Sequence, residues 1–210
     1  MRAAAKWPLN FAKQFVYAPG NISPAWRNLP DVEIVGITRW LDNRPQEAGL
    51  VTIAALERAR ALAASTLPAE VLEPRFQSAY QRTLVLACVG AMQANEPEEI
   101  LPLTEEMTRI AAGAGIEASL QASLRRGSAL TLLGRLAEAQ AELGPAWLEA
   151  RRASLPGIAL DIGAWLAHTR YDAGRLLEAR EVADECEALA ERIGEFSRPA
   201  MGARMWRLIS

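Results

Sequence analysis

The sequence contains a segment that recurs with a period near 40 residues. The hexapeptide Gly-Arg-Leu-Ala-Glu-Ala at 134–139 returns as Gly-Arg-Leu-Leu-Glu-Ala at 174–179, and weaker copies begin at Asn95 and at Asn43. A period of this length corresponds to one supersecondary unit that cannot bury its apolar face alone, so neighbouring units must stack. This requirement constrains the fold more than any other feature of the chain.

Each copy has the pattern of a corner between two helices. A Gly or Asn stands first, which suits the left-handed residue that ends a helix, and Pro45 and Pro97 stand close to the start of the next one. Apolar residues downstream recur at steps of three and four, as at Leu136, Ala139, Leu143, Ala146, Trp147 and Ala150. The pattern predicts helices at about 31–42, 47–64, 71–93, 97–112, 116–132, 136–152, 157–172 and 176–193, and a last helix from about 197.

Mostly small residues stand at fixed distances from the turn residue of each copy. Seven residues before it are Gly36, Cys88, Gly127 and Ala167; five after it are Ala48, Ile100, Ala139 and Ala179; twelve after it are Ala55, Met107, Ala146 and Cys186. Two helices approach to about 8 Å only where the side chains at the crossing are short. The positions therefore predict close crossings between the two helices of each copy.

In these positions the chain resembles the tetratricopeptide family, whose repeat is a first helix, a turn with Gly, and a second helix with Glu-Ala near its start. The chain departs from the family in four respects. Ile100 and Met107 stand where the family has small residues, and Tyr171 stands one position after the family's aromatic residue. The proline that ends the family's repeat is absent, and the period exceeds the usual ~34 residues. Longer helices of this kind resemble the repeat regions of large bacterial ATP-dependent regulators of the MalT and LuxR type and of cyclase-associated signalling proteins.

The resemblance implies an all-α fold, a right-handed α-solenoid of about four antiparallel helix pairs with an unpaired C-terminal helix. We expect the repeats to occupy 31–210 and an N-terminal arm or cap to occupy 1–30. The next turn would fall beyond the last residue, so the last helix is either a cap or the first helix of an interrupted pair, and of the two we expect a fragment of a longer array. The arm places Trp7, Phe11 and Phe15 among basic residues, which fits either a packed cap or a partner-docking segment.

The composition is typical of packed helices, and the charge balance and the absence of long apolar runs argue against some classes of function. Half of the residues are hydrophobic and only 6% are aromatic. With 23 basic and 25 acidic residues, no global field attracts nucleic acid or an anionic membrane. No apolar run is long enough to span a bilayer, and no signal-peptide core is present, so we expect a cytoplasmic protein. Cys88 and Cys186 have no metal or disulfide spacing and are predicted to be buried packing residues.

The common catalytic motifs are missing from the sequence. It has no GxxxxGK[ST], no HExxH and no GxSxG, and its only histidine is His168. Acid–base chemistry by histidine, or a histidine-ligated metal, would therefore rest on one residue. We expect a binding protein that is not an enzyme and needs neither cofactor nor metal.

The resemblance also implies a binding surface on the concave face, lined by the first helix of each pair. The residues at the family's offsets are Glu33, Trp40, Arg82, Met92, Gln121, Thr131, Asp161, His168 and Tyr171. Asp161, His168 and Tyr171 share one helical stripe and combine a charge, a titratable ring and an aromatic anchor. Two interpretations stay open for them, a partner-binding cluster and a satisfied structural network.

The leading hypothesis is a non-enzymatic scaffold that captures a protein or peptide segment. In a bacterial signalling or transcription regulator, such a module would couple the sensory and output domains. The alternative is an effector-sensing repeat, in which a small molecule in the groove changes the curvature of the stack. Partner identity and oligomeric state do not follow from the sequence.

Overall fold

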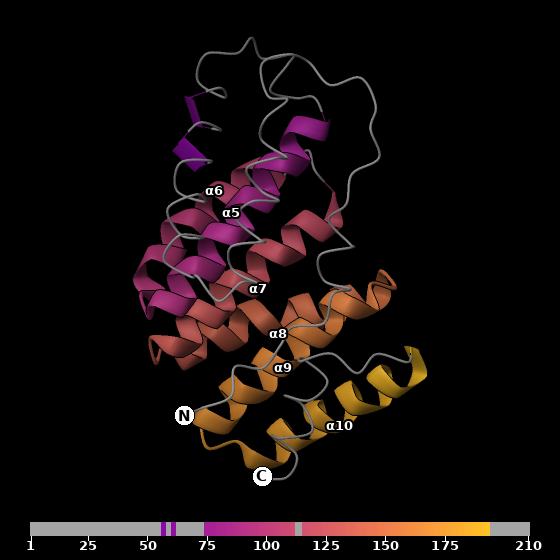
Figure 1. Ribbon diagram of the computed structural model, residues 1–210. Coiled ribbons are helices and arrows are strands. Elements are labelled where there is room, and N and C mark those ends of the chain that lie inside the picture. The colour runs from indigo at the N-terminus through magenta and orange to yellow at the C-terminus, as the bar shows by residue number, and fades with distance from the viewer. Residues whose placement is uncertain (1–55, 58–59, 62–73, 112–114, 194–210) are drawn as a thin grey trace, which may run out of the picture. The chain divides into compact units, whose positions relative to one another are not determined.

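The computed structural model describes residues 56–57, 60–61, 74–111 and 115–193, and in this part of the chain it is all-helical (Figure 1). The chain divides into two compact units between Ala94 and Asn95. The first contains α5 (Pro74–Ala94). The second contains η2 (Pro97–Glu99), α6 (Ile100–Ala111), α7 (Ile116–Leu132), α8 (Leu136–Arg152), α9 (Pro156–Asp172) and α10 (Leu176–Ile193).

Several predicted features lie outside the described residues. These are the arm at 1–30, the helix at 31–42, most of the helix at 47–64, the helix from 197, and the candidate residues Glu33 and Trp40. The predicted helices of the second unit are confirmed to within a few residues at their ends. Pro156 begins α9, where its fixed φ suits the first turn, and a 3₁₀ turn at Pro97–Glu99 precedes α6.

The predicted left-handed turn residues are also confirmed. Asn95, Gly134 and Gly174 have φ values of 61°, 71° and 74°. After α7, the amide of Gly134 donates to the carbonyl of Thr131 and that of Arg135 to the carbonyl of Leu130, both at 2.9 Å. The same two bonds recur 40 residues later, after α9. This Schellman arrangement satisfies carbonyls at the helix end and requires positive φ, which explains Gly at both positions.

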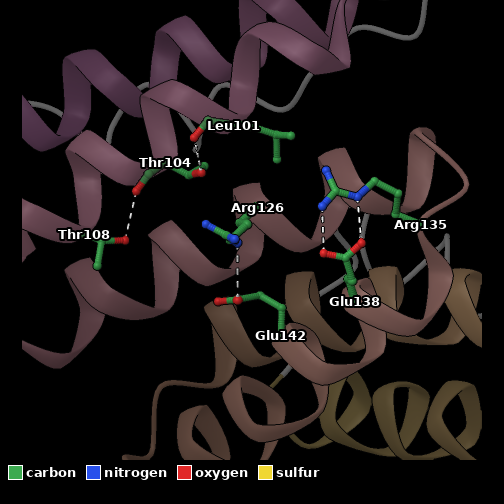
Figure 2. A network of polar contacts seen from close by, with 7 residues as sticks. All are labelled: Leu101, Thr104, Thr108, Arg126, Arg135, Glu138 and Glu142. Carbon is green, nitrogen blue, oxygen red and sulfur yellow. Dashed lines mark hydrogen bonds and ion pairs between the residues drawn. The ribbon is translucent and has the colours of Figure 1, made fainter.

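The arginine and glutamate of the repeated hexapeptide pair with each other at the start of the second helix. Arg135 donates from Nε and Nη2 to the two carboxylate oxygens of Glu138, at 2.7 Å each (Figure 2). Arg175 and Glu178 form the same pair in the next copy. The hydrogen bond from Arg135 lowers the pKa of Glu138. Both pairs are solvent-exposed and add little stability, so they position the first turn of α8 and α10 rather than hold the fold together.

Each helix of the second unit packs against its neighbour in the chain. In addition, α7 packs against α9, so two first helices lie side by side. Their common core is a cluster of buried residues from α7, α8, α9 and α10, including Leu124, Leu143, Trp147, Leu166 and Cys186. Packing of each helix against its neighbours therefore accounts for the apolar periodicity of the sequence.

The predicted small positions that the structure describes are buried, and one of them lies at a close contact between two helices. A Cβ at Gly127 would lie 2.4 Å from Cγ of Leu143, so α7 and α8 approach closely at this glycine. The remaining described members of the set are all buried: Cys88, Ile100, Met107, Ala139, Ala146, Ala167, Ala179 and Cys186. Burial raises the pKa of the Cys186 thiol to about 12. The prediction that both cysteines are buried packing residues is confirmed.

Several polar side chains on α6, α7 and α8 bond to groups close by (Figure 2). The buried hydroxyl of Thr104 donates to the carbonyl of Leu101 at 2.7 Å, and Thr108 donates to the carbonyl of Thr104 at 2.9 Å. Arg126 on α7 lies 3.7 Å from Glu142 on α8. These side chains are therefore paired within the fold.

Candidate functional site

The candidate residues that the structure describes lie on three helices. Arg82 and Met92 are on α5 and are half-buried. Gln121 and Thr131 are on α7, whereas Asp161, His168 and Tyr171 are on α9. Because α7 and α9 are in contact, the residues on these two helices belong to neighbouring elements of the fold.

Thr131 is buried at the contact between α7 and α9. Its Oγ1 atom lies 2.7 Å from Oγ1 of Thr169 and 2.9 Å from the carbonyl oxygen of Gly127, and only 4% of the residue is exposed. A hydroxyl in this position holds two neighbouring helices together and is not accessible to a partner. Thr131 is therefore left out of the candidate surface.

His168 is held between two neighbours on its own helix. Its ring stacks on that of Trp165, with 5.4 Å between the centroids and 23° between the planes, and its Nε2 atom lies 3.1 Å from Oδ2 of Asp172. Burial lowers the pKa of His168, and the carboxylate of Asp172 opposes this effect. The neutral imidazole therefore predominates at neutral pH.

Trp165 and Asp172 were not among the predicted site residues. Their spacing from His168, three residues before it and four after it, places all three on one face of a helix, so the signal was present in the sequence. Asp161 lies one turn before Trp165, and Tyr171 is half-buried beside Asp172 in the chain. One stripe of α9 thus carries two carboxylates, an imidazole and two aromatic rings.

Gln121 and Arg125 occupy the matching positions on α7, 40 residues before Asp161 and Trp165. Both are half-buried, and the buried atoms Oε1 of Gln121 and Nε of Arg125 have no hydrogen-bond partner in the described part of the chain. An unsatisfied buried polar atom costs about 1–3 kcal/mol, so such atoms in a native fold call for an explanation. We name the two residues on α7 together with Asp161, Trp165, His168, Tyr171 and Asp172 the α7/α9 surface.

The α7/α9 surface offers hydrogen-bonding groups and aromatic rings. Within the described ranges, no group of three His, Cys, Asp or Glu residues is placed to hold a metal ion. Within the same ranges, no helix combines the length and the apolarity that crossing a membrane requires. What the arrangement can do is recognise a polar or aromatic group of another molecule by contact.

Comparisons with models of protein families, with curated proteins and with solved structures found no match to this chain. The resemblance to the tetratricopeptide family therefore stays a prediction made from the residues, while the helical fold comes from the structure.

The environment of His168 predicts opposite pKa shifts for two substitutions. Trp165→Ala should raise the pKa of His168, because water then reaches the imidazole, whereas Asp172→Asn should lower it further, because the imidazolium loses its carboxylate. Because His168 is the only histidine, an NMR titration of its ring protons reports these changes without ambiguity. Two shifts in the same direction would contradict the described environment.

The lowered pKa also predicts how stability depends on pH. The unfolded chain binds the proton more tightly than the folded chain, so the unfolded state gains protons first as the pH falls below about 6.5, the ordinary histidine value. The stability that neutral His168 contributes is present above that pH and is lost as the pH falls through the folded-state pKa. As the pH falls, the melting temperature of the wild type should therefore decrease more steeply than that of His168→Gln.

Proposed function

We propose that the chain is a protein-binding scaffold of the tetratricopeptide type, a right-handed α-solenoid that captures a segment of a partner protein on the α7/α9 surface. Three findings support the repeat architecture. Two helix ends 40 residues apart have the same Schellman bonds, the hexapeptide Arg-Glu pair recurs, and the predicted small position Gly127 lies where α7 and α8 approach closely.

One observation carries the assignment of the binding surface. Two neighbouring first helices place hydrogen-bonding and aromatic groups at equivalent repeat positions, and two buried polar atoms among them lack partners. A surface kept only for stability would gain from apolar side chains there, since each unsatisfied atom is costly. Natural proteins keep such costs mainly where a function requires them.

The wider role that we propose is regulatory. A stack of long helix pairs couples two domains by holding both, and the sequence resembles repeat regions of bacterial signalling and transcription regulators. In this role the chain acts in the cytoplasm by binding alone, without catalysis or a cofactor. Its partner is a protein or peptide, and the chain itself does not contact nucleic acid or a membrane.

Site-specific photocrosslinking in a lysate of the source cell tests the surface. A crosslinking amino acid in place of Tyr171 should capture a defined protein, whereas the same group in place of Leu177, which is 79% exposed on α10, should not. Gln121→Leu should abolish the capture without lowering the melting temperature, because the substitution removes an unsatisfied buried acceptor.

The outcomes separate a binding role from a structural one. If Gln121→Leu lowers the melting temperature, the amide serves the fold and the α7/α9 surface loses its main support. If positions 171 and 177 yield the same products, capture is nonspecific and the surface is wrongly placed.

The effector-sensing alternative predicts a different result. A small molecule bound in the groove would raise the melting temperature of the purified chain with no protein partner present. A thermal-shift screen of the wild type beside Gln121→Leu would reveal such a ligand and show whether it uses the same surface.

A further inference from the structure

A second surface lies where α8 and α10 end and α9 begins. There the chain forms a groove of about 620 Å³. Its floor includes the buried residues Ala150, Ala159 and Leu189, and Leu155 is half-buried beside them. At its edge, Leu148 is 49% exposed and Ile193 is 40% exposed. The groove shares no residue with the α7/α9 surface.

The charged residues that line this groove are all arginines. Arg151 lies over the ring of Trp147, 5.1 Å from its centroid, and is paired with Glu185. Arg152 and Arg192 are exposed, and among the described residues neither has an ion-pair partner. No acidic side chain lines the groove in the described part of the chain.

Arginine in the last turn of a helix has an ordinary explanation, since each helix C-terminus carries about half a negative charge. Two helices end here and α9 begins here, so their dipoles together offset roughly half of one arginine charge, and Glu185 offsets one more. Roughly one and a half of the three positive charges remain. The helix dipoles do not account for the exposure of Leu148 and Ile193, because a helix C-terminus needs no exposed apolar side chains beside its arginines.

We propose that this groove docks an acidic peptide segment whose apolar side chains pack between Leu148 and Ile193 and whose carboxylates pair with Arg152 and Arg192. The occupant follows from complementarity: an apolar floor needs leucine-like side chains, and a positive rim needs flanking acids. A basic or uniformly polar segment would leave the two arginines unpaired and the floor uncovered. The surface is independent of the α7/α9 surface, so either assignment can fail alone.

The test uses the full chain and a fluorescein-labelled peptide with Leu along one face of a helix and Glu at both edges of that face, read by fluorescence anisotropy. The wild type should bind it, and Arg152→Glu/Arg192→Glu should weaken the binding at least roughly tenfold. Leu148→Ser should weaken it as well, because the apolar wall is lost. Arg180→Glu, at an exposed arginine on α10 outside the groove, should leave binding unchanged. Raising the salt concentration should weaken the wild-type complex.

Several outcomes would overturn the proposal. These are no binding of the peptide, an equal loss with Arg180→Glu, or equal binding of a peptide in which Lys replaces Glu. Binding of phosphatidylserine vesicles that is lost in Arg152→Glu/Arg192→Glu, with no binding of the peptide, would assign the groove to a lipid surface instead. Circular dichroism of each variant confirms that the helices are retained.

Discussion

Leu143→Ala is expected to lower the free energy of unfolding by about 2–5 kcal/mol. The side chain is fully buried on α8 and packs against Gly127 of α7. Its removal loses apolar burial and leaves a cavity that rigid neighbouring helices cannot fill. Urea unfolding followed by circular dichroism measures the change. Leu177→Ala removes the same atoms from a side chain that is 79% exposed and should cost less than about 0.5 kcal/mol.

A second substitution tests the reason for that loss. In the wild type, Gly127→Ala should be destabilising by about 1–3 kcal/mol, because the new Cβ would lie 2.4 Å from Cγ and 2.5 Å from Cδ2 of Leu143. In the Leu143→Ala background those atoms are gone, so the same change should become neutral or stabilising through the better helix propensity of alanine. If the two losses simply add, the helices do not cross at Gly127 as described.

The helix ends and turns were predictable because their determinants are local. Left-handed residues at Asn95, Gly134 and Gly174 follow from the few residue types that tolerate positive φ. Ser154, with φ of 55°, ends α8 in the same way and was not predicted as a turn residue, since serine seldom takes this conformation. Residue type therefore predicts the turns made by Gly and Asn and misses the turn made by Ser154.

The candidate site was predictable only in part, because burial depends on which helices become neighbours. Thr131 and Tyr171 hold the same repeat position, yet Thr131 is buried against Thr169 while Tyr171 remains half-exposed. A repeat register treats the two as equivalent and cannot distinguish them. The missing partners of Gln121 and Arg125 likewise follow from packing around α7, which no spacing in the sequence reports.

The groove between α8 and α10 lay beyond sequence reasoning for a similar reason. Leu148 and Ile193 are 45 positions apart and belong to two different second helices. Each one alone is an ordinary exposed apolar residue. They form one surface only because α8 and α10 end at the same place, against the start of α9.

Gly163→Ala should destabilise the fold by at least about 3 kcal/mol, which is the upper end of the usual range for adding a methyl group to a packed core. The added Cβ would lie 2.3 Å from Sγ of Cys186 and 2.7 Å from Cζ3 of Trp147. Both neighbours are buried, so neither can turn into solvent, and α8 and α10 must both move away from α9. Thermal and urea unfolding should show the loss.

Gly157→Ala on the same helix is the matched control for this prediction. A Cβ at Gly157 meets nothing within 4 Å, and its φ is not in the left-handed region, so alanine should raise stability by up to about 1 kcal/mol. Cys186→Ala in the Gly163→Ala background removes the sulfur but leaves Trp147, so it should recover part of the loss. Equal effects at the two glycines would contradict the description. The small positions predicted from the repeat do not include 163, so the requirement for glycine there comes from the side chains that pack against it, Cys186 of α10 and Trp147 of α8.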